Sequence, residues 1–253
     1  MFENRLKRML KEGKTAYGSF AACNSPDLIE IMGITGMDFV IIDTEHGPMN
    51  VESTQNLIRA AELRGMTPIT RVTEGSESTI LRSLDVGAHG IQVPQINTKE
   101  AAQKIVEYAK YFPIGSRGLA MPRASGYGAM NALEYLEHSN KETLIVTHCE
   151  NKQCLEEVDA IAAIPEIDVI FLGPFDMSQS LGIPGQVNHQ MINDAAKKVV
   201  DVCRTHGKAA GIFVGDGEQA KRRAAEGFQY VVIGLDITLF SKICKQELAV
   251  AKT

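Results

Sequence analysis

The chain has 253 residues, a formal charge of −5 and 44% apolar residues, which is typical of a protein that folds around one large hydrophobic core. The acidic balance argues against a nucleic-acid-binding protein, and we expect neither a secretory signal nor a membrane span, which needs roughly 18 consecutive apolar residues. The five cysteines are scattered without a C-x-x-C pair, as is typical of free thiols in a reducing compartment, so we expect a cytoplasmic protein.

Short apolar runs that are rich in β-branched residues recur along the chain and predict strands. In chain order they are AYGSF (16–20), DFVIID (38–43), PITRV (68–72), GIQVP (90–94), TLIVT (143–147), DVIFL (168–172), AGIFV (210–214) and YVVIG (230–234). Most of these runs are continuous rather than alternating. Continuous apolar strands are buried on both faces, as in a parallel sheet that is covered by helices.

Helical segments lie between these runs, and several of them end at a glycine. The glycines in question are Gly36, Gly65, Gly87, Gly207 and Gly227. Glycine readily adopts the left-handed conformation that closes a helix. Asn97 and Glu100 have the spacing of a capping box and predict the start of another helix. Eight strand–helix units in about 250 residues predict a (β/α)8 TIM barrel, with a doubly wound open sheet as the alternative.

No linker, repeat or low-complexity segment divides the chain, so we expect a single barrel domain over residues 1–253. The regular pattern is interrupted at 113–128 (PIGSRGLAMPRASGYG). Irregular segments of this length inside a compact domain are more often functional than not, and we expect a functional loop here.

Polar residues at the C-terminal ends of the predicted strands are candidates for catalysis, because the active sites of α/β barrels lie at that end. In chain order they are Asp43, Glu45, His46, Arg71, His148, Glu150, Asp176, Asp216 and Asp236. Glu150 and Asp176 follow adjacent strands and could hold a divalent cation. Arg71 could bind a carboxylate or stabilise an enolate, and Asp43 could hold the ring of His46 and raise its basicity.

Each candidate also has a structural interpretation. A strand-end aspartate often caps the next helix, which applies to Asp176 and Asp216. Arg71 and Glu45 could each be a structural ion-pair partner. His148 could be a metal ligand, a substrate contact or a side chain that only fills space beside the site. The predicted strands contain no lysine, which disfavours an aldolase that works through a Schiff base.

Four segments together resemble the HpcH/HpaI family of class II, metal-dependent pyruvate aldolases. They are the Asp43-x-x-His46 segment, PITRVTEG around Arg71, LDVGAHGI around Asp85 and FLGPFDMSQSLG around Asp176. The resemblance extends from about residue 17 to 240. It implies a TIM barrel of the phosphoenolpyruvate/pyruvate-binding type. It also implies an enzyme that reversibly cleaves a 4-hydroxy-2-oxo acid into pyruvate and an aldehyde through a metal-bound pyruvate enolate.

The resemblance implies roles for particular catalytic residues. Glu150 and Asp176 would bind Mg2+ or Mn2+, with Co2+ able to substitute, and no organic cofactor is implied. His46 would be the base. Arg71 would stabilise the enolate oxygen. In support of the base, Asp85 would raise the basicity of His46 and Asp43 would hold it in position.

Four further positions are implied to bind the substrate. Backbone amides near Gly173 and Phe175 would bind the carboxylate of pyruvate. The chain departs from the family at His148, where glutamine is common, and at Phe175, where alanine is common. Phe213 places a bulky ring near the expected aldehyde. We therefore expect a pocket with a different shape from that of the best-known members.

Family members form hexamers, as trimers of dimers with an exchanged C-terminal helix, so the resemblance implies a homohexamer. In that assembly, the loop from Arg117 to Tyr127 would complete the site of a neighbouring subunit. One alternative function is a CoA-thioester lyase of the citrate lyase β-subunit type, although no basic cluster for the CoA phosphates is evident. Another is a barrel that binds a metal and an oxo acid without turnover. A phosphosugar isomerase that uses the loop around Gly215 is more remote.

Overall fold

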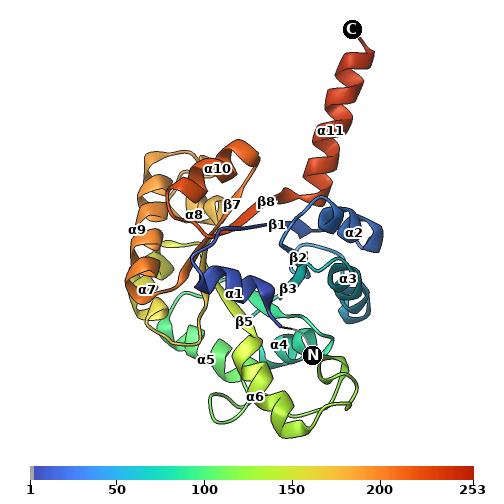
Figure 1. Ribbon diagram of the computed structural model, residues 1–253. Coiled ribbons are helices and arrows are strands. Elements are labelled where there is room, and N and C mark those ends of the chain that lie inside the picture. Colours follow the sequence, from blue (N-terminus) through green and yellow to red (C-terminus); the bar gives the residue numbers. More distant parts are fainter. Residues whose placement is uncertain (1–2) are drawn as a thin grey trace.

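The structure is a computed structural model that describes residues 3–253. Within that range, eight parallel strands form a closed barrel in which each strand pairs with its neighbours in chain order (Figure 1). The strands are β1 (Ala16–Ala21), β2 (Phe39–Asp43), β3 (Thr67–Arg71), β4 (Gly90–Val93), β5 (Leu144–Cys149), β6 (Val169–Leu172), β7 (Ala209–Val214) and β8 (Tyr230–Leu235). Each predicted run contributes a strand, and the prediction of a (β/α)8 barrel is confirmed.

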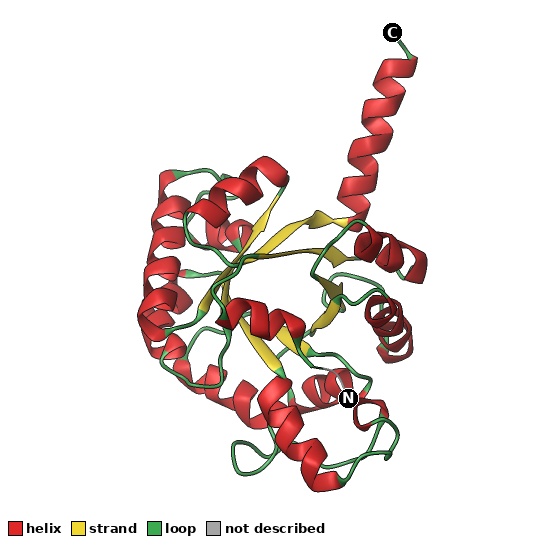
Figure 2. Cartoon of the chain, viewed as in Figure 1, coloured by secondary structure: helices red, strands yellow, loops and turns green. Residues whose placement is uncertain are grey.

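Helices surround the barrel (Figure 2). They are α1 (Arg5–Lys11), α2 (Pro26–Ile34), α3 (Val51–Leu63), α4 (Glu77–Asp85), α5 (Lys99–Ala109), α6 (Ala132–Glu142), α7 (Lys152–Ala162), α8 (Pro174–Ser180), α9 (Gln190–His206), α10 (Gly217–Ala225) and α11 (Asp236–Ala251), with a short 3-10 helix, η1 (Arg123–Ser125). The five predicted helix-ending glycines all have positive φ, from 64° at Gly207 to 110° at Gly227. The predicted cap of α5 is wrong by one residue: Thr98 caps the helix, while the side chain of Asn97 accepts a hydrogen bond from Asn151.

The core has an inner and an outer part. Inside the barrel, apolar side chains from seven strands pack together, and Leu6 and Leu10 of α1 join them at the N-terminal end. Helix α1 therefore closes that end of the barrel. Outside, two larger clusters fill the space between the strands and the surrounding helices. The C-terminal ends of the strands form the opposite rim of the barrel.

The segment 113–128 lies at the N-terminal end of the barrel, because it connects α5 to α6 ahead of β5. Arg117 donates to Asp85 at 2.7 Å, and its guanidinium carbon lies 4.7 Å from the centre of the Tyr111 ring. Arg123 forms an ion pair with Glu62 at the end of α3. Within one chain, this segment is thus attached to the end of the barrel opposite to the candidate residues.

The last helix, α11, extends away from the barrel (Figure 1). Its exposed apolar side chains are Ile237, Phe240, Ile243, Leu248 and Val250. No helix in the described range 3–253 combines the length and the apolar character that a membrane crossing requires.

Candidate active site

Arg71 and Asp43 form the central ion pair at the C-terminal end of the barrel. Their Cα atoms are partners in the register of β2 and β3. The Nε and Nη2 atoms of Arg71 donate to the two carboxylate oxygens of Asp43 at 2.9 and 2.5 Å, and Asp43 is fully buried. Arg71 also lies 3.3 Å from a carboxylate oxygen of Glu45. Such a bidentate ion pair fixes the orientation of the guanidinium plane.

Asp43 also shapes the turn that carries His46. Its Oδ1 atom accepts the backbone N–H groups of Glu45 and His46 at 3.1 and 3.2 Å. Asp43 therefore holds the backbone of His46, whereas we had expected it to hold the ring. The side chain of His46 is exposed. The turn requires Gly47, because a Cβ atom there would lie 2.3 Å from the carbonyl oxygen of Asp43.

Glu45 is confirmed as an ion-pair partner of Arg71, as the structural interpretation proposed. Burial raises the pKa of Glu45 above its usual value, although the Arg71 guanidinium opposes this effect. The side chain of Glu45 thus lies beside Arg71 and is only partly accessible to water.

Glu150 ends a chain of hydrogen bonds that begins in the barrel interior. The hydroxyl of Tyr230 donates to Oε1 of Gln92 at 2.8 Å, and the Gln92 amide lies 2.8 Å from Nε2 of His148. Nδ1 of His148 lies 2.8 Å from one oxygen of Glu150, and the other oxygen accepts the backbone N–H of Gln95 at 2.7 Å. The consistent assignment is that Gln92 donates to His148, which then donates from Nδ1 to Glu150.

This network determines the charge state of Glu150. Burial favours the protonated carboxyl, but the hydrogen bonds from His148 and from the backbone N–H of Gln95, together with the charge of Arg71, act in the opposite direction, and the pKa of Glu150 is lowered. Both ring nitrogens of His148 already have protein partners, and its ring is 2% exposed. His148 therefore supports Glu150, and its predicted contact with a substrate stays a prediction.

Glu150 and Asp176 both lie beside Gly173. A Cβ atom on Gly173 would lie 3.0 Å from Oε2 of Glu150 and 3.9 Å from Oδ2 of Asp176, so both carboxylates approach this residue and any larger side chain here would crowd Glu150. Asp176 lies in the first turn of α8, which begins after Gly173 and has no side-chain cap. Asp216, by contrast, is the cap of α10, because it accepts the backbone N–H of Gln219 at 2.9 Å.

Two neighbouring carboxylates with hard oxygen donors fit Mg2+ or Mn2+. Among residues 3–253, no group of three or more His, Cys, Asp or Glu side chains is arranged to hold a metal ion. Mg2+ in enzymes is commonly held by one or two carboxylates, with water and substrate in the other positions. Glu150 and Asp176 could therefore hold a divalent metal and leave positions for a substrate.

Asp85 does not meet His46 within the chain. Asp85 is the last residue of α4, which runs back from the C-terminal to the N-terminal end of the barrel, and it pairs with Arg117. His46 follows β2 at the C-terminal end. The predicted effect of Asp85 on His46 can therefore operate only between subunits, where it stays a prediction.

Aromatic side chains form a second group at this end of the barrel. The ring centres of Phe20 and Phe213 are 6.1 Å apart, as are those of Phe213 and Phe175. Phe20 lies under the guanidinium of Arg71, whose carbon is 4.5 Å from the ring centre. The predicted substrate-binding residues Phe213 and Phe175 are thus brought into contact with the ion-pair group through Phe20.

Several contributors to the site were missed from the sequence. Gln92 had a signal, since it is a polar residue inside the apolar run GIQVP. Gln95 had none, because its role depends on a left-handed backbone (φ 56°), which is rare for a residue other than glycine. The sequence indicates Tyr230 and Phe20 as ordinary core residues. Only the register of the strands shows that their side chains contact residues of the site.

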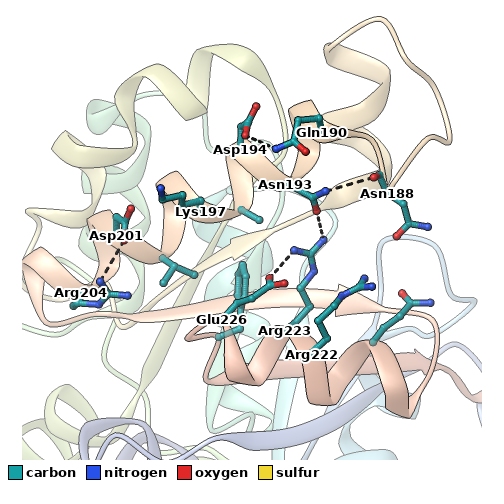
Figure 3. Close-up of a pocket in the computed structure, with 14 residues that line it drawn as sticks. Asn188, Gln190, Asn193, Asp194, Lys197, Asp201, Arg204, Arg222, Arg223 and Glu226 are labelled. Atoms are coloured by element: carbon teal, nitrogen blue, oxygen red, sulfur yellow. Dashed lines mark hydrogen bonds and ion pairs between the residues drawn. The ribbon is translucent and has the colours of Figure 1, made fainter.

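A separate groove of about 700 Å3 lies on the outer flank of the barrel between α9 and α10 (Figure 3). Several of its charged side chains are paired with one another: Arg204 with Asp201, and Arg223 with Glu226. Its lining contains none of the candidate residues of the strand ends. The chemistry of the molecule is therefore expected at the barrel rim and not in this groove.

Residues 16–242 match the family model that describes HpcH/HpaI aldolase/citrate lyase. The chain belongs to this family. A 2-keto-3-deoxy-L-rhamnonate aldolase from Klebsiella pneumoniae subsp. pneumoniae is 32% identical to it over 255 residues, covering 100% of this chain and 95% of the relative. The predicted family is confirmed, and the expectation of an aldolase, a carbon–carbon lyase, is confirmed at the level of the family.

Solved structures of the HpcH/HpaI family share the whole fold. An HpcH/HpaI aldolase/citrate lyase family protein from Burkholderia cenocepacia has a TM-score of 0.94 and 28% identity, and the match covers 99% of this chain and 100% of that one. The citrate synthase SbnG has a TM-score of 0.89 and 33% identity, with 98% and 97% coverage. Both matches extend over the barrel and α11.

Proposed function

We propose that the chain is a divalent-metal-dependent aldolase that reversibly cleaves a 4-hydroxy-2-oxo acid into pyruvate and an aldehyde. The observation that carries this proposal is that the carboxylates of Glu150 and Asp176 both lie beside Gly173. Arg71 and His46 lie at the same end of the barrel. Membership of the family supports the reaction type and its dependence on a divalent metal.

Glu150 and Asp176 would hold Mg2+ or Mn2+, or Co2+ as a substitute. When bound, the ion would act as a Lewis acid that polarises the 2-oxo group. The protein contributes the orientation of Glu150, because His148 and Gln95 each occupy one lone pair of its carboxylate oxygens. A carboxylate that is held in this way keeps its geometry when substrates enter and leave.

In the cleavage direction, His46 accepts the proton of the C4 hydroxyl group. The C3–C4 bond then breaks, the C4 carbonyl of the aldehyde forms, and the electron pair of the broken bond passes to the pyruvate enolate. Protonation of the enolate at C3 completes pyruvate. Arg71 stabilises the negative charge on the enolate oxygen, and Asp43 fixes its guanidinium for that task. Backbone amides near Gly173 and Phe175 bind the pyruvate carboxylate.

The proposed assembly is a homohexamer built as a trimer of dimers. It is supported by the exposed apolar side chains of α11, which extends from the barrel (Figure 1). It would also bring the segment 113–128 and Asp85 of one subunit to the strand ends of a neighbour. Removal of residues 236–253 is expected to yield dissociated protein in light scattering, and a hexamer that persists without them would refute this arrangement.

A second candidate is a reaction of a CoA thioester with a 2-oxo acid. The observation that favours it is the 33% identity to the citrate synthase SbnG. A metal-dependent release of free CoA from acetyl-CoA in the presence of an oxo acid would select this candidate over the aldolase.

The aldolase proposal is tested by pyruvate release from a panel of 4-hydroxy-2-oxo acids, with Mg2+ or Mn2+ and then with EDTA. Release that needs metal and stops with EDTA is expected. Glu150→Ala and Asp176→Ala should abolish it with the fold retained, whereas the matched control Asp216→Ala removes only a helix cap and should keep turnover. Near-normal turnover of Glu150→Ala, or release that resists EDTA, would refute the metal assignment.

A further inference from the structure

The C-terminal end of the barrel is divided into a polar half and an aromatic half. Inward positions alternate along a strand, and those at the ends of β2 to β5 carry the polar residues described above. The corresponding inward positions of β6, β7 and β1 carry Phe171, Phe213 and Phe20, which pack in the barrel interior. The last inward position of β8 is Gly234. The polar side chains, including the ion pair, and the aromatic side chains thus lie on opposite halves of the C-terminal end of the barrel.

The rings form a continuous wall, which we call the aromatic wall: Phe20, Phe213 and Phe175. It begins under Arg71, where the guanidinium carbon lies 4.5 Å from the centre of the Phe20 ring. It continues through Phe213, with 6.1 Å between successive ring centres. It ends at Phe175, which is 54% exposed and precedes Asp176 in the chain. The wall therefore runs from the proposed enolate-binding group to solvent.

The carboxylates that follow β7 and β8 are used for local structure. Asp216 caps α10 by accepting the N–H of Gln219 at 2.9 Å. Asp236 accepts the backbone N–H groups of Ala22 and Cys23, at 3.0 and 2.9 Å, and so ties the start of α11 to the loop after β1. These two carboxylates are therefore already engaged as hydrogen-bond acceptors beside the aromatic wall.

We infer that the aldehyde partner of this site is apolar beyond its carbonyl group, an alkyl or aryl aldehyde rather than a polyhydroxylated or carboxylated one. This inference rests on the aldolase reaction proposed above. Ring faces shield an alkyl or aryl group from water, but they do not replace the hydrogen bonds that a hydroxyl or carboxylate makes with water. Apolar pockets discriminate against an added hydroxyl by about 100-fold at most.

A three-carbon aldehyde series tests the inference without changing chain length. Propanal, lactaldehyde and glyceraldehyde carry zero, one and two hydroxyl groups, and each is condensed with pyruvate at saturating metal. We expect kcat/KM, corrected for the hydrated fraction of each aldehyde, to fall by about 10-fold or more along the series. Butanal should likewise exceed succinic semialdehyde. Equal or higher values for glyceraldehyde or succinic semialdehyde would overturn the inference.

Variants test whether the aromatic wall causes the preference. Phe213→Ala should lower the ratio of propanal to glyceraldehyde kcat/KM by about 10-fold, and Phe213→Leu should largely retain it, because leucine is also apolar. Phe112→Ala is the matched control, since this ring is 83% exposed and follows α5 at the other end of the barrel. If Phe213→Ala does not fold, the more exposed Phe175→Ala replaces it. An unchanged ratio in a folded variant of the wall would overturn the inference.

A measurement without any aldehyde separates this inference from the proposed function. Exchange of the C3 protons of pyruvate with D2O, followed by NMR, reports enolate formation alone. Metal-dependent exchange together with no preference among aldehydes would refute the apolar partner and leave the aldolase proposal standing. Absence of both exchange and pyruvate release would refute the aldolase proposal itself, and the inference with it.

Discussion

The Gly173→Ala substitution is the sharpest test of the proposed metal site. The backbone of Gly173 has φ −92°, which alanine adopts without strain, so the only change is the added methyl group. This methyl would lie 3.0 Å from Oε2 and 3.2 Å from Cβ of Glu150. Both distances are shorter than the roughly 3.5–4.0 Å of an optimal contact between carbon atoms, so Glu150 has to move by a few tenths of an ångström.

Glu150 cannot move freely, because hydrogen bonds of 2.7 and 2.8 Å from Gln95 and His148 hold its two oxygens. We expect a loss of about 1–3 kcal/mol in the free energy of unfolding, as for other overpacked sites. The larger effect falls on metal binding, where displaced supporting contacts typically cost about 10- to 100-fold in affinity. Both effects have the same cause, the crowding of one carboxylate.

The assay is titration of the folded protein with Mn2+, followed by electron paramagnetic resonance, with urea unfolding in parallel. Gly217→Ala is the matched control, because it lies at the first position of α10 and a Cβ there has no heavy atom within 4 Å. It should bind Mn2+ as the unmodified chain does. Wild-type Mn2+ affinity in folded Gly173→Ala would show that Glu150 is not a ligand beside Gly173.

Three further substitutions probe the groups behind the site and at the base of the barrel. Asp43→Asn should lower the free energy of unfolding in urea by about 3 kcal/mol, because Arg71 loses its buried, charged partner. It should also lower turnover while the metal stays bound. Unchanged stability would contradict this ion pair. Tyr230→Phe should lower the free energy of unfolding by about 1–3 kcal/mol, because Oε1 of Gln92 loses its hydrogen-bond donor while the stacked ring remains. Unchanged stability would show that the Tyr230 hydroxyl does not contribute to the network. Burial lowers the pKa of Lys110 from 10.5 to about 7. Between these pH values the unfolded chain binds more protons than the folded chain, so the free energy of unfolding should rise with pH by up to about 1.4 kcal/mol per pH unit. The urea midpoint should therefore rise from pH 7 to pH 9, and it should rise less in Lys110→Met than in the unmodified chain. An equal rise in both proteins would refute the role of Lys110.

The fold was predictable because its signals are local and repeated. Continuous apolar runs such as FVII and VIFL, which are short and rich in β-branched residues, favour buried parallel strands. A glycine at the end of a helix signals the left-handed conformation, and Gly227 shows it clearly, with φ 110°. The cap of α5 was misplaced because Asn97 and Thr98 are both good caps, and a contact with distant Asn151 decides between them.

The composition of the site was predictable only in part. The polar strand ends indicated Asp43 and Arg71 one by one, but only the register of the strands places them side by side. Two roles depend on distances that no local pattern encodes. His148 lies beneath Glu150 because Gln92 and Tyr230 fill the space on its other side. Asp85 resembles a catalytic residue in sequence, but the direction of α4 carries it to the opposite end of the barrel.

The division of the rim has a consequence for how this enzyme could diverge. Phe20 and Phe171 are tied to the chemistry, because the first lies under Arg71 and the second packs on His148 with 4.9 Å between ring centres. Phe213 and Phe175 contact other rings of the wall instead. Phe213 nevertheless shares the partner Phe20 with Arg71, so substitutions of Phe213 and of the ion-pair group should combine non-additively. A change of the wall is therefore also felt by the group that breaks the carbon–carbon bond.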